Sequence, residues 1–357
     1  MDMTKPLWAG AAALALVLPG ATTAASGPDD GLPIKAHLLA SGLAGSIGGT
    51  VGPDGALYVP QFALGEITRI DTETGAMTTF ASGLPQPISF VGLGGAFDVA
   101  FAGTTAYVLV ALVGPEDFGP PALGGFSTGS SGIYRIDGGT PTLIADLGAF
   151  SAAHPPTGTF DYFLQGGVQY AMEGVADGFL VTDGHHNRIL HVDFSGGISV
   201  VKQFGNVVPS GLDVFRGQVF LAEIGAITEI PGSPGSYQAI GEVTAFDLGD
   251  PMDAGPVAGG ISMAVDVQSG PGDSLYALGQ GTWPPGAGPD AAGAPALPDT
   301  GQLLRINRDG SSSVLLDGIN LPTSLHFAGG IAYVVTLSGD VWKVRGISGA
   351  ARSAHAR

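Results

Sequence analysis

The 357-residue sequence has no cysteine and few charged residues. The absence of cysteine excludes a fold held together by disulfides. Only 12% of the residues are charged, about half the usual share, which excludes a coiled coil. Basic residues are scarcest, since 13 Lys and Arg stand against 31 Asp and Glu, for a formal net charge of −18. Such an acidic chain is a poor partner for nucleic acid or for an anionic membrane surface.

Glycine and proline are abundant instead, with 60 and 26 residues respectively, and 45% of the residues are hydrophobic. The glycines separate short apolar runs and do not form tracts of their own. A chain with this much apolar content can bury a core, so the composition excludes a disordered protein. Together these features predict a glycine-rich, acidic, all-β globular protein.

The first 25 residues have the three-part pattern of a secretory signal peptide. Lys5 precedes an apolar run over residues 7–18, a Pro-Gly break, and small residues up to Ala25. The run is shorter than the roughly 20 residues of a membrane span, and an uncleaved membrane anchor is the alternative. We expect cleavage after Ala24 or Ala25. The mature protein is then secreted or periplasmic, a monomer without a membrane span.

A pattern of short strands recurs six times in the rest of the chain. Each unit has an apolar strand, a tight turn, a second strand ending in Tyr-Val or similar, and a third strand related to Ile-x-Arg-Ile-Asp. Examples of the third strand are Glu66-Ile-Thr-Arg-Ile-Asp71, Gly132-Ile-Tyr-Arg-Ile-Asp137 and Gly301-Gln-Leu-Leu-Arg-Ile-Asn307. A fourth apolar strand follows the third. Repeated four-stranded units are typical of the blades of a β-propeller.

The sixth unit has no fourth strand, whereas residues 34–40 form a spare strand before the first unit. We therefore predict an all-β fold over residues 34–346, a single six-bladed β-propeller of four-stranded blades whose last blade is closed by the N-terminal strand. Closure removes the exposed sheet edges of an open array. An open β-solenoid is the structural alternative. Residues 347–357 are interpreted as a flexible polar tail.

The long loops all fall on one face of the predicted ring. The turns between first and second strands, and between third and fourth strands, are short. Four long insertions lie on the opposite face, at residues 113–131, 148–167, 224–240 and 279–300. They contain acidic and aromatic residues and no Lys or Arg. Long loops on a rigid scaffold often carry function. This face suits a cation, a sugar or an aromatic ligand and disfavours an anion, with solvated loop tips as the alternative.

Polar residues recur at one position of the first strands, which line the central channel of a propeller. Aligning these strands places six residues at one position: Thr50, Ala100, Glu173, Asp213, Gln268 and His326. Two residues earlier come Gly48, Asp98, Ala171, Gly211, Asp266 and Ser324. Carboxylates and a histidine that converge in a channel can bind a divalent cation or act as acid and base.

The candidate ligand-binding residues in the channel are therefore Glu173, Asp213, His326, Asp98, Asp266 and Gln268. Glu173 and Asp213 are also candidate ligands of a divalent cation such as calcium. The alternative is a wet channel whose carboxylates bind neighbouring backbone amides. His185 and His186, at a turn tip, are expected to point in different directions and predict no metal site.

The aligned blades resemble the ScyD/ScyE family of exported propellers over roughly residues 34–344. The resemblance is carried by Asp146-Leu-Gly-Ala-Phe-Ser-Ala-Ala-His154 and by the strand–turn–strand at residues 178–193. Val181-Thr-Asp-Gly-His-His-Asn-Arg-Ile189 also resembles an NHL repeat. The family has Asn-Pro-Tyr where this sequence has Val168-Gln169-Tyr170, and we count Gln169 among the candidate ligand-binding residues. The resemblance implies a propeller fold and export, and no catalytic motif.

Three functional hypotheses follow. The first is an exported ScyD/ScyE-type propeller that binds a small or polymeric, carbohydrate-like ligand on the long-loop face and in the central channel, with a divalent cation as a candidate cofactor. The second is an enzyme, a metal-dependent lactonase-like hydrolase or a lyase. The third is a platform for protein interactions. Fold analogy alone does not choose between them; convergence of three or four oxygen ligands in the channel would favour the metal-dependent enzyme.

Overall fold

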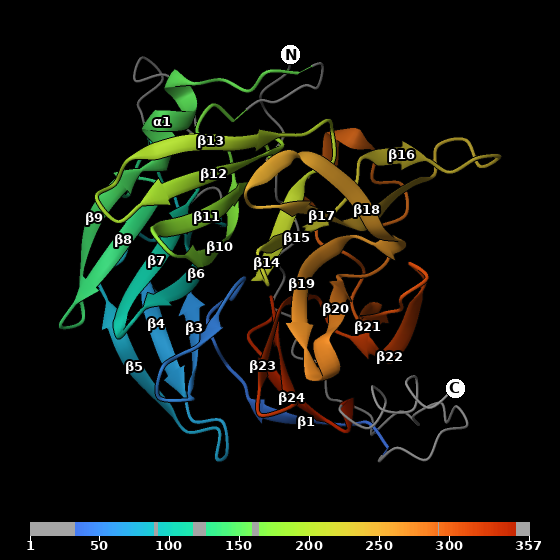
Figure 1. The fold of residues 1–357 in the computed structure, drawn as a ribbon, viewed down its shortest axis with the longest axis horizontal. Coiled ribbons are helices and arrows are strands. Elements are labelled where there is room, and N and C mark those ends of the chain that lie inside the picture. Colours follow the sequence, from blue (N-terminus) through green and yellow to red (C-terminus); the bar gives the residue numbers. More distant parts are fainter. Residues whose placement is uncertain (1–32, 89–91, 117–125, 159–163, 292, 348–357) are drawn as a thin grey trace.

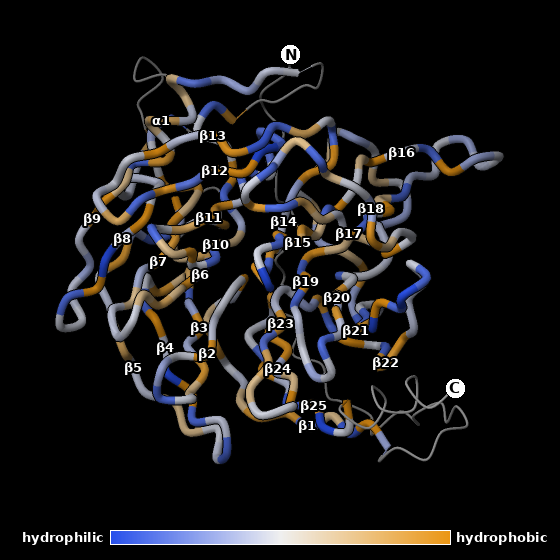
Figure 2. Tube along the Cα trace, viewed as in Figure 1, coloured by the Kyte–Doolittle hydropathy of each residue, from blue (hydrophilic) through white to orange (hydrophobic). Residues whose placement is uncertain are grey.

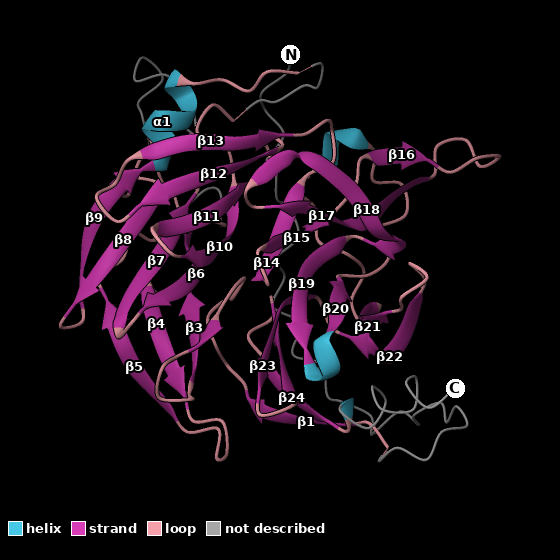
Figure 3. Cartoon of the chain, viewed as in Figure 1, coloured by secondary structure: helices cyan, strands magenta, loops and turns pink. Residues whose placement is uncertain are grey.

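A computed structural model describes residues 33–88, 92–116, 126–158, 164–291 and 293–347, and the predicted signal peptide lies outside these residues. Figure 1 shows six antiparallel sheets arranged around a centre, and Figure 3 shows that the regular structure of the described chain is mostly strand, with few short helices. Each sheet has four strands in the main blade order, with one short additional strand in the fourth. The predicted all-β, six-bladed β-propeller is confirmed.

Blades one to three follow the chain from its second strand. They consist of β2 (Thr50–Val51), β3 (Leu57–Gln61), β4 (Glu66–Ile70) and β5 (Met77–Ser82); of β6 (Gly95–Ala102), β7 (Thr105–Ala111), β8 (Gly132–Asp137) and β9 (Thr140–Asp146); and of β10 (Gln169–Val175), β11 (Gly178–Asp183), β12 (Arg188–Asp193) and β13 (Ile198–Gln203). In each blade the first strand is innermost and the fourth is outermost.

Blades four to six repeat this order with two variations, an added strand and a borrowed one. They consist of β14 (Pro209–Phe215), β15 (Gln218–Glu223), β17 (Tyr237–Asp247) and β18 (Asp250–Ser262), with β16 (Ile227–Glu229) paired to β17; of β19 (Ala264–Gly270), β20 (Ser274–Gly279), β21 (Gly301–Ile306) and β22 (Ser312–Ile319); and of β23 (Pro322–Ala328), β24 (Ile331–Thr336), β25 (Val341–Arg345) and β1 (Lys35–Ala40).

The N-terminal strand closes the ring as predicted. β1 pairs antiparallel with β25, so that Lys35 lies opposite Arg345 and Leu38 opposite Trp342. Figure 1 shows the blue β1 against the red strands of the last blade. Ile347 is fully buried against this blade, so the domain extends into the first residue of the predicted tail; residues 348–357 lie outside the described part of the chain.

The core lies between neighbouring blades. Second strands such as β3 and β11 are buried along their whole length, because each is covered on both faces by an adjacent blade. This environment explains their continuous apolar runs, whereas the outer strand β5 is mostly exposed. Figure 2 shows hydrophobic segments along the inner strands and hydrophilic ones at the outer turns. Each fully buried side chain, such as Val108 or Leu109, contributes roughly 1.5–3 kcal/mol to folding.

Three of the predicted long loops contain regular structure that the sequence does not predict: a helix, a hairpin and a short 3-10 turn. In the loop from 148 to 167, helix α1 (Leu147–Ala153) forms because the Asp146 carboxylate accepts a hydrogen bond from the Ala149 N–H at 2.9 Å and caps the first turn. In the loop from 224 to 240, β16 and the start of β17 form a hairpin that projects from the ring (Figure 1).

Short 3-10 helices occur at η2 (Pro271–Asp273) and η3 (Pro289–Ala291). Among the residues that the structure describes, no helix is long and apolar enough to cross a membrane.

Candidate functional site

A cavity of about 2190 Å³ follows the central channel of the ring. Its wall is formed mainly by the six first strands, β2, β6, β10, β14, β19 and β23. The cavity reaches Leu164 and Trp283 in the long loops at one end, and Ala102 and Ala176 beside the short turns at the other. The predicted channel site is therefore an open space of ligand size.

The strand register confirms that the six aligned positions are equivalent. Each of them lies opposite a large apolar or aromatic residue of the second strand in its own blade. The pairs are Thr50 with Tyr58, Ala100 with Tyr107, Glu173 with Leu180, Asp213 with Phe220, Gln268 with Tyr276 and His326 with Tyr333. The large partners are anchored in the core between the blades, which fixes all six positions at the same level along the channel.

Asp98 and Asp266 connect blades through their carboxylates. Asp98 accepts hydrogen bonds from the N–H groups of Gly49 in blade one, Val99 in its own blade and Met172 in blade three, at 2.8–2.9 Å. Burial raises the pKa of Asp98 to about 7, against the opposing effect of these three bonds.

Asp266 repeats this arrangement in blade five. It accepts from Val267 N at 2.8 Å and from Leu325 N of blade six at 2.7 Å, and burial raises its pKa well above the ordinary value. Glycine is required beside both aspartates: a Cβ on Gly48 would lie 2.3 Å from the Asp98 carboxylate, and one on Gly211 2.4 Å from that of Asp266. For these two residues the structure favours the alternative in which carboxylates bind backbone amides.

Asp213 and Gln268 lie between blades four and five. The Asp213 carboxylate accepts a hydrogen bond from Ser269 N at 2.7 Å. Asp213 is not among the described residues that line the cavity, whereas Gln268 is. The Gln268 amide is 3.5 Å from the Leu212 carbonyl, a long contact, and the Gln268 side chain also hydrogen-bonds to the Asp266 carboxylate.

Glu173 lines the cavity from the middle of β10, as Asp98 and Asp266 do from β6 and β19. Burial within the channel and, to a smaller extent, the charges of Asp213, Asp98 and Asp266 together raise its pKa to about 8, while a backbone hydrogen bond from Gly174 acts against the rise. No other side chain of the described residues donates a hydrogen bond to it. Glu173 is therefore largely protonated near neutral pH and can donate or accept a hydrogen bond in the cavity.

His326 faces the same cavity from β23. Its Nε2 lies 3.0 Å from the Ser324 hydroxyl. Burial lowers the pKa of His326 to about 4, so the imidazole is neutral at physiological pH. A Cβ on Gly49 would approach the His326 Nε2 to 3.1 Å. The absence of a side chain at Gly49 therefore leaves space for the imidazole ring.

The residues present do not fit the predicted calcium site. Within the described parts of the chain, no three His, Asp or Glu side chains are grouped so that they could hold a metal ion. The physical reason is that Asp98, Asp213 and Asp266 already accept hydrogen bonds from backbone N–H groups, whereas calcium needs six to eight oxygen ligands turned toward one point. Glu173 is left without a partner carboxylate in the cavity wall at its own level.

The long-loop end of the cavity is mostly apolar. Its wall includes Leu93, Leu112, Leu164, Met263, Trp283 and Leu337. The Trp283 indole N–H donates to the Ala287 carbonyl at 2.6 Å, which fixes the ring within its own loop. Gln169 lies behind this mouth and is fully buried; it does not line the cavity, and its amide donates to the Gly166 carbonyl at 2.9 Å.

Two adjacent histidines hold the mouth in place. The Nε2 of His185 accepts from Leu164 N at 3.1 Å, and the Nε2 of His186 donates to Leu164 O at 2.9 Å. Burial lowers the pKa of His185 to about 4, in keeping with its role as acceptor. The sequence predicts that the two rings point in different directions, whereas both contact the backbone of Leu164, which lies 21 residues before His185 in a loop.

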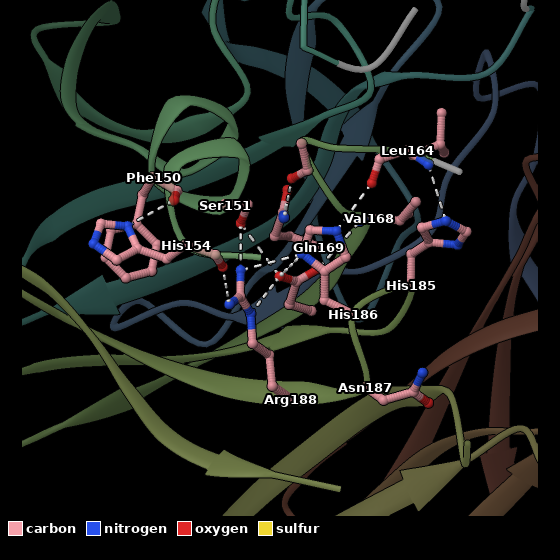
Figure 4. A network of polar contacts seen from close by, with 12 residues as sticks. Phe150, Ser151, His154, Leu164, Val168, Gln169, His185, His186, Asn187 and Arg188 are labelled. Atoms are coloured by element: carbon pink, nitrogen blue, oxygen red, sulfur yellow. Dashed lines mark hydrogen bonds and ion pairs between the residues drawn. The ribbon is translucent and has the colours of Figure 1, made fainter. Parts of the chain in front are cut away.

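A buried ion-pair network, shown in Figure 4, also holds the loop at residues 148–167. The Arg188 guanidinium donates to Asp183 at 2.9 Å, to the Ser151 hydroxyl at 2.9 Å and to the His154 carbonyl at 2.7 Å. His186 Nδ1 lies 3.1 Å from the Asp183 carboxylate. Burial raises the pKa of Asp183, but the hydrogen bonds and charges of His186 and Arg188 hold it below the ordinary value.

This network ties α1 and the mouth loop to blade three. The sequence analysis did not predict this network, although Asp183 and Arg188 lie directly opposite each other across β11 and β12. An Asp and an Arg that flank a short turn between two apolar strands were the available signal. Ser151 could not have been recognised in this way, since it approaches from a different part of the chain.

No protein-family model and no curated protein sequence matches the chain. Solved structures do match. The PQQ-bound aldose sugar dehydrogenase of Streptomyces coelicolor is 15% identical with a TM-score of 0.55, over 90% of this chain and 99% of that one. A gluconolactonase of Xanthomonas campestris is 10% identical with a TM-score of 0.54, over 87% of this chain and 89% of that one.

A Bacteroides thetaiotaomicron protein of unknown function is 10% identical, with a TM-score of 0.56, over 87% of this chain and 75% of its own. At these identities the likeness shows the fold alone. The fold and the cavity together define the class of this protein, a six-bladed β-propeller with a ligand-sized central channel.

Proposed function

We propose that the protein binds a small organic ligand in the central cavity and admits it from the long-loop face. One observation carries this proposal: a cavity of about 2190 Å³ with polar groups at mid-depth and an apolar mouth. Ligand sites commonly combine a mostly apolar wall with a few polar groups that set orientation. The ScyD/ScyE resemblance supports the same reading, an exported propeller that binds a ligand.

The ligand is uncharged or cationic. No Lys or Arg of the described residues lines the cavity, while Asp98, Glu173 and Asp266 do. An anion entering this space would lose its hydration without gaining a cation as partner. Pyrroloquinoline quinone, which carries three carboxylates, therefore does not fit the wall. A polyol such as a sugar remains compatible, because Glu173, Gln268 and Ser324 offer hydrogen bonds.

The test is to fill the cavity without disturbing the blade. Thr50 lines the channel, so Thr50→Phe places an aromatic ring in it, and Thr78→Phe adds the same ring on the exposed outer strand β5. Thermal-shift screening of wild type with sugars, sugar lactones and amines should give stabilising compounds. Those shifts should disappear in Thr50→Phe and persist in Thr78→Phe. Shifts that persist in Thr50→Phe would place the ligand away from the level of Thr50 in the channel.

A hydrolase or lyase activity is the second candidate, and the chemistry of Glu173 favours it. A carboxylic acid with a pKa of about 8 and a neutral imidazole, His326, face one cavity. Such a pair can supply a general acid and a general base near neutral pH. Incubation with aldonolactones, with and without EDTA, would test this. Ring opening that is lost in Glu173→Gln supports the assignment; hydrolysis at the uncatalysed rate excludes lactonase activity.

Export is part of the proposed function, since a secretory leader places the ligand outside the cytoplasm. The support is the leader pattern of the first 25 residues. Mass spectrometry of the protein from intact cells should give an N-terminus at Ala25 or Ser26. An N-terminus at Met1 on membrane-bound protein would contradict it.

A further inference from the structure

The charge inside the cavity has one sign. Asp98, Glu173 and Asp266 line it, and no Lys or Arg of the described residues does. The two histidines in the wall, His185 and His326, are neutral at physiological pH because burial lowers the pKa of each to about 4. The space therefore holds carboxyl groups with no positive side chain to balance them.

The carboxyl groups differ in what they bind. Asp98 and Asp266 accept hydrogen bonds from backbone N–H groups of adjacent blades, and Asp213, nearby, accepts from Ser269 N. Glu173 lines the cavity as Asp98 and Asp266 do, but it does not bridge two blades: its carboxylate accepts a backbone hydrogen bond from Gly174 and none from another side chain of the described residues. Apart from the backbone hydrogen bond from Gly174, a donor for its carboxylate therefore has to come from a molecule in the cavity.

The rest of the wall indicates the shape of that molecule. Toward the long-loop face the cavity wall includes the apolar side chains Leu112, Leu164, Met263 and Trp283, with a few polar side chains such as Gln280 among them. A ligand that reaches Glu173 from this face keeps its remaining atoms among these apolar groups. The net charge of −18 over the whole chain also attracts cations toward the channel.

We propose that the cavity binds an organic amine, a cationic ammonium group carried on an apolar or aromatic body, with the ammonium on Glu173 and the body toward the long-loop mouth. This inference rests on the proposed function and specifies its ligand class. The ammonium supplies a donor and a positive charge that no side chain of the cavity wall provides and so favours the ionised form of Glu173; a charge-assisted hydrogen bond is about twice as strong as a neutral one. A metal ion could pair with the charge of Glu173 but would make no contact with the apolar part of the cavity wall.

The experiment compares three probes that share one body and differ in the head group: 2-phenylethylamine, 2-phenylethanol and phenylacetate, with calcium ion alone as a fourth. Isothermal titration at pH 8.5 measures each against wild type, Glu173→Gln and Glu116→Gln. Glu173→Gln keeps the shape of the side chain and removes its charge. Glu116 lies in a long loop outside the residues that line the cavity, so Glu116→Gln is the matched control.

We expect the amine to bind wild type at least tenfold more tightly than the alcohol, and phenylacetate not to bind. Glu173→Gln should lower the amine affinity at least tenfold and leave the alcohol unchanged, while Glu116→Gln should change neither. Equal affinities for amine and alcohol, or amine binding that survives Glu173→Gln, would overturn the inference. The inference would also be overturned if calcium ion binds to wild type and 2-phenylethylamine does not.

The outcome is separable from that of the proposed function. If sugars or the alcohol bind in a way that Thr50→Phe abolishes, while the amine shows no preference, the channel remains a ligand site and the amine assignment is wrong. If the amine binds equally well to Thr50→Phe, its site is not the channel and the inference also fails. Thermal melts of Glu173→Gln, expected to be at least as stable as wild type at pH 8.5, exclude misfolding as the cause of lost binding.

Discussion

Replacing Glu173 with Gln should stabilise the folded protein above neutral pH. An ordinary Glu has a pKa of 4.5, and burial raises that of Glu173 to about 8. Between these values the folded protein keeps a proton that the unfolded chain has released. The free energy of unfolding therefore falls as the pH rises from about 4.5 to about 8. Gln carries no ionisable proton, so the variant is not subject to this loss.

The magnitude follows from the two pKa values. At 1.36 kcal/mol per pKa unit, the difference between them corresponds to about 5 kcal/mol as an upper limit. Water in the cavity and the coupled ionisation of Asp98 and Asp266 reduce this value, because protons are shared among interacting carboxyl groups. We expect a gain of about 2–4 kcal/mol at pH 8.5 and about 1 kcal/mol or less at pH 5.

Urea unfolding at pH 5.0 and at pH 8.5 measures this effect on wild type, Glu173→Gln and Glu116→Gln. The stability difference between Glu173→Gln and wild type should grow with pH, and Glu116→Gln should follow wild type at both values. A difference that is the same at both pH values, or a Glu173→Gln variant less stable than wild type at pH 8.5, would show that the carboxyl group is not held in a costly buried position.

Three further changes test other parts of the ring. Deleting Lys35–Ala40 exposes the edge of β25 and the apolar side chains packed behind β1, so the free energy of unfolding should fall by about 3–5 kcal/mol; a truncated protein that melts like the parent would mean that the ring closes differently. Asp98→Ala leaves three buried N–H groups unpaired and should cost about 3–5 kcal/mol, with Asp98→Asn less harmful because it keeps an acceptor oxygen; equal losses would contradict the bridging role. Arg188→Met leaves the buried Asp183 carboxylate without its cationic partner and should lower the free energy of unfolding by about 3–5 kcal/mol. The double variant that also carries Asp183→Asn should recover part of this loss, as measured by chemical denaturation.

The fold could be predicted because its repeat is encoded in local patterns. Each second strand is covered on both faces, so it reads as an unbroken apolar run such as Phe179-Leu-Val181. Each run is flanked by a turn of predictable length, and the spare strand at residues 34–40 could be matched to the one blade that lacked a strand. The same register placed Glu173, Gln268 and His326 at one level of the channel.

The chemistry of the site could be predicted less well, because it depends on contacts between distant residues. The sequence treats Glu173 and Asp213 as equivalent, yet Asp213 binds Ser269 N, 56 residues away, and does not line the cavity. The predicted calcium site fails for this reason. Likewise, Ser151 and His154 lie 37 and 34 residues before Arg188 in the sequence, and only the folded structure brings them to its guanidinium.

The joint between β1 and β25 has a consequence for how the chain can be cut and rejoined. Ile34 and Ile347 belong to one hydrophobic cluster, and Lys35 pairs with Arg345, so both ends of the described domain meet on the same blade. A short linker from residue 347 to residue 33, with new ends opened in the exposed turn Pro53-Asp-Gly55, yields a circular permutant with every strand pairing retained. In such a permutant the four strands of the last blade are consecutive in the chain. The blade that is built from both ends of the chain is then the first one, and the choice of the opened turn decides which blade this is.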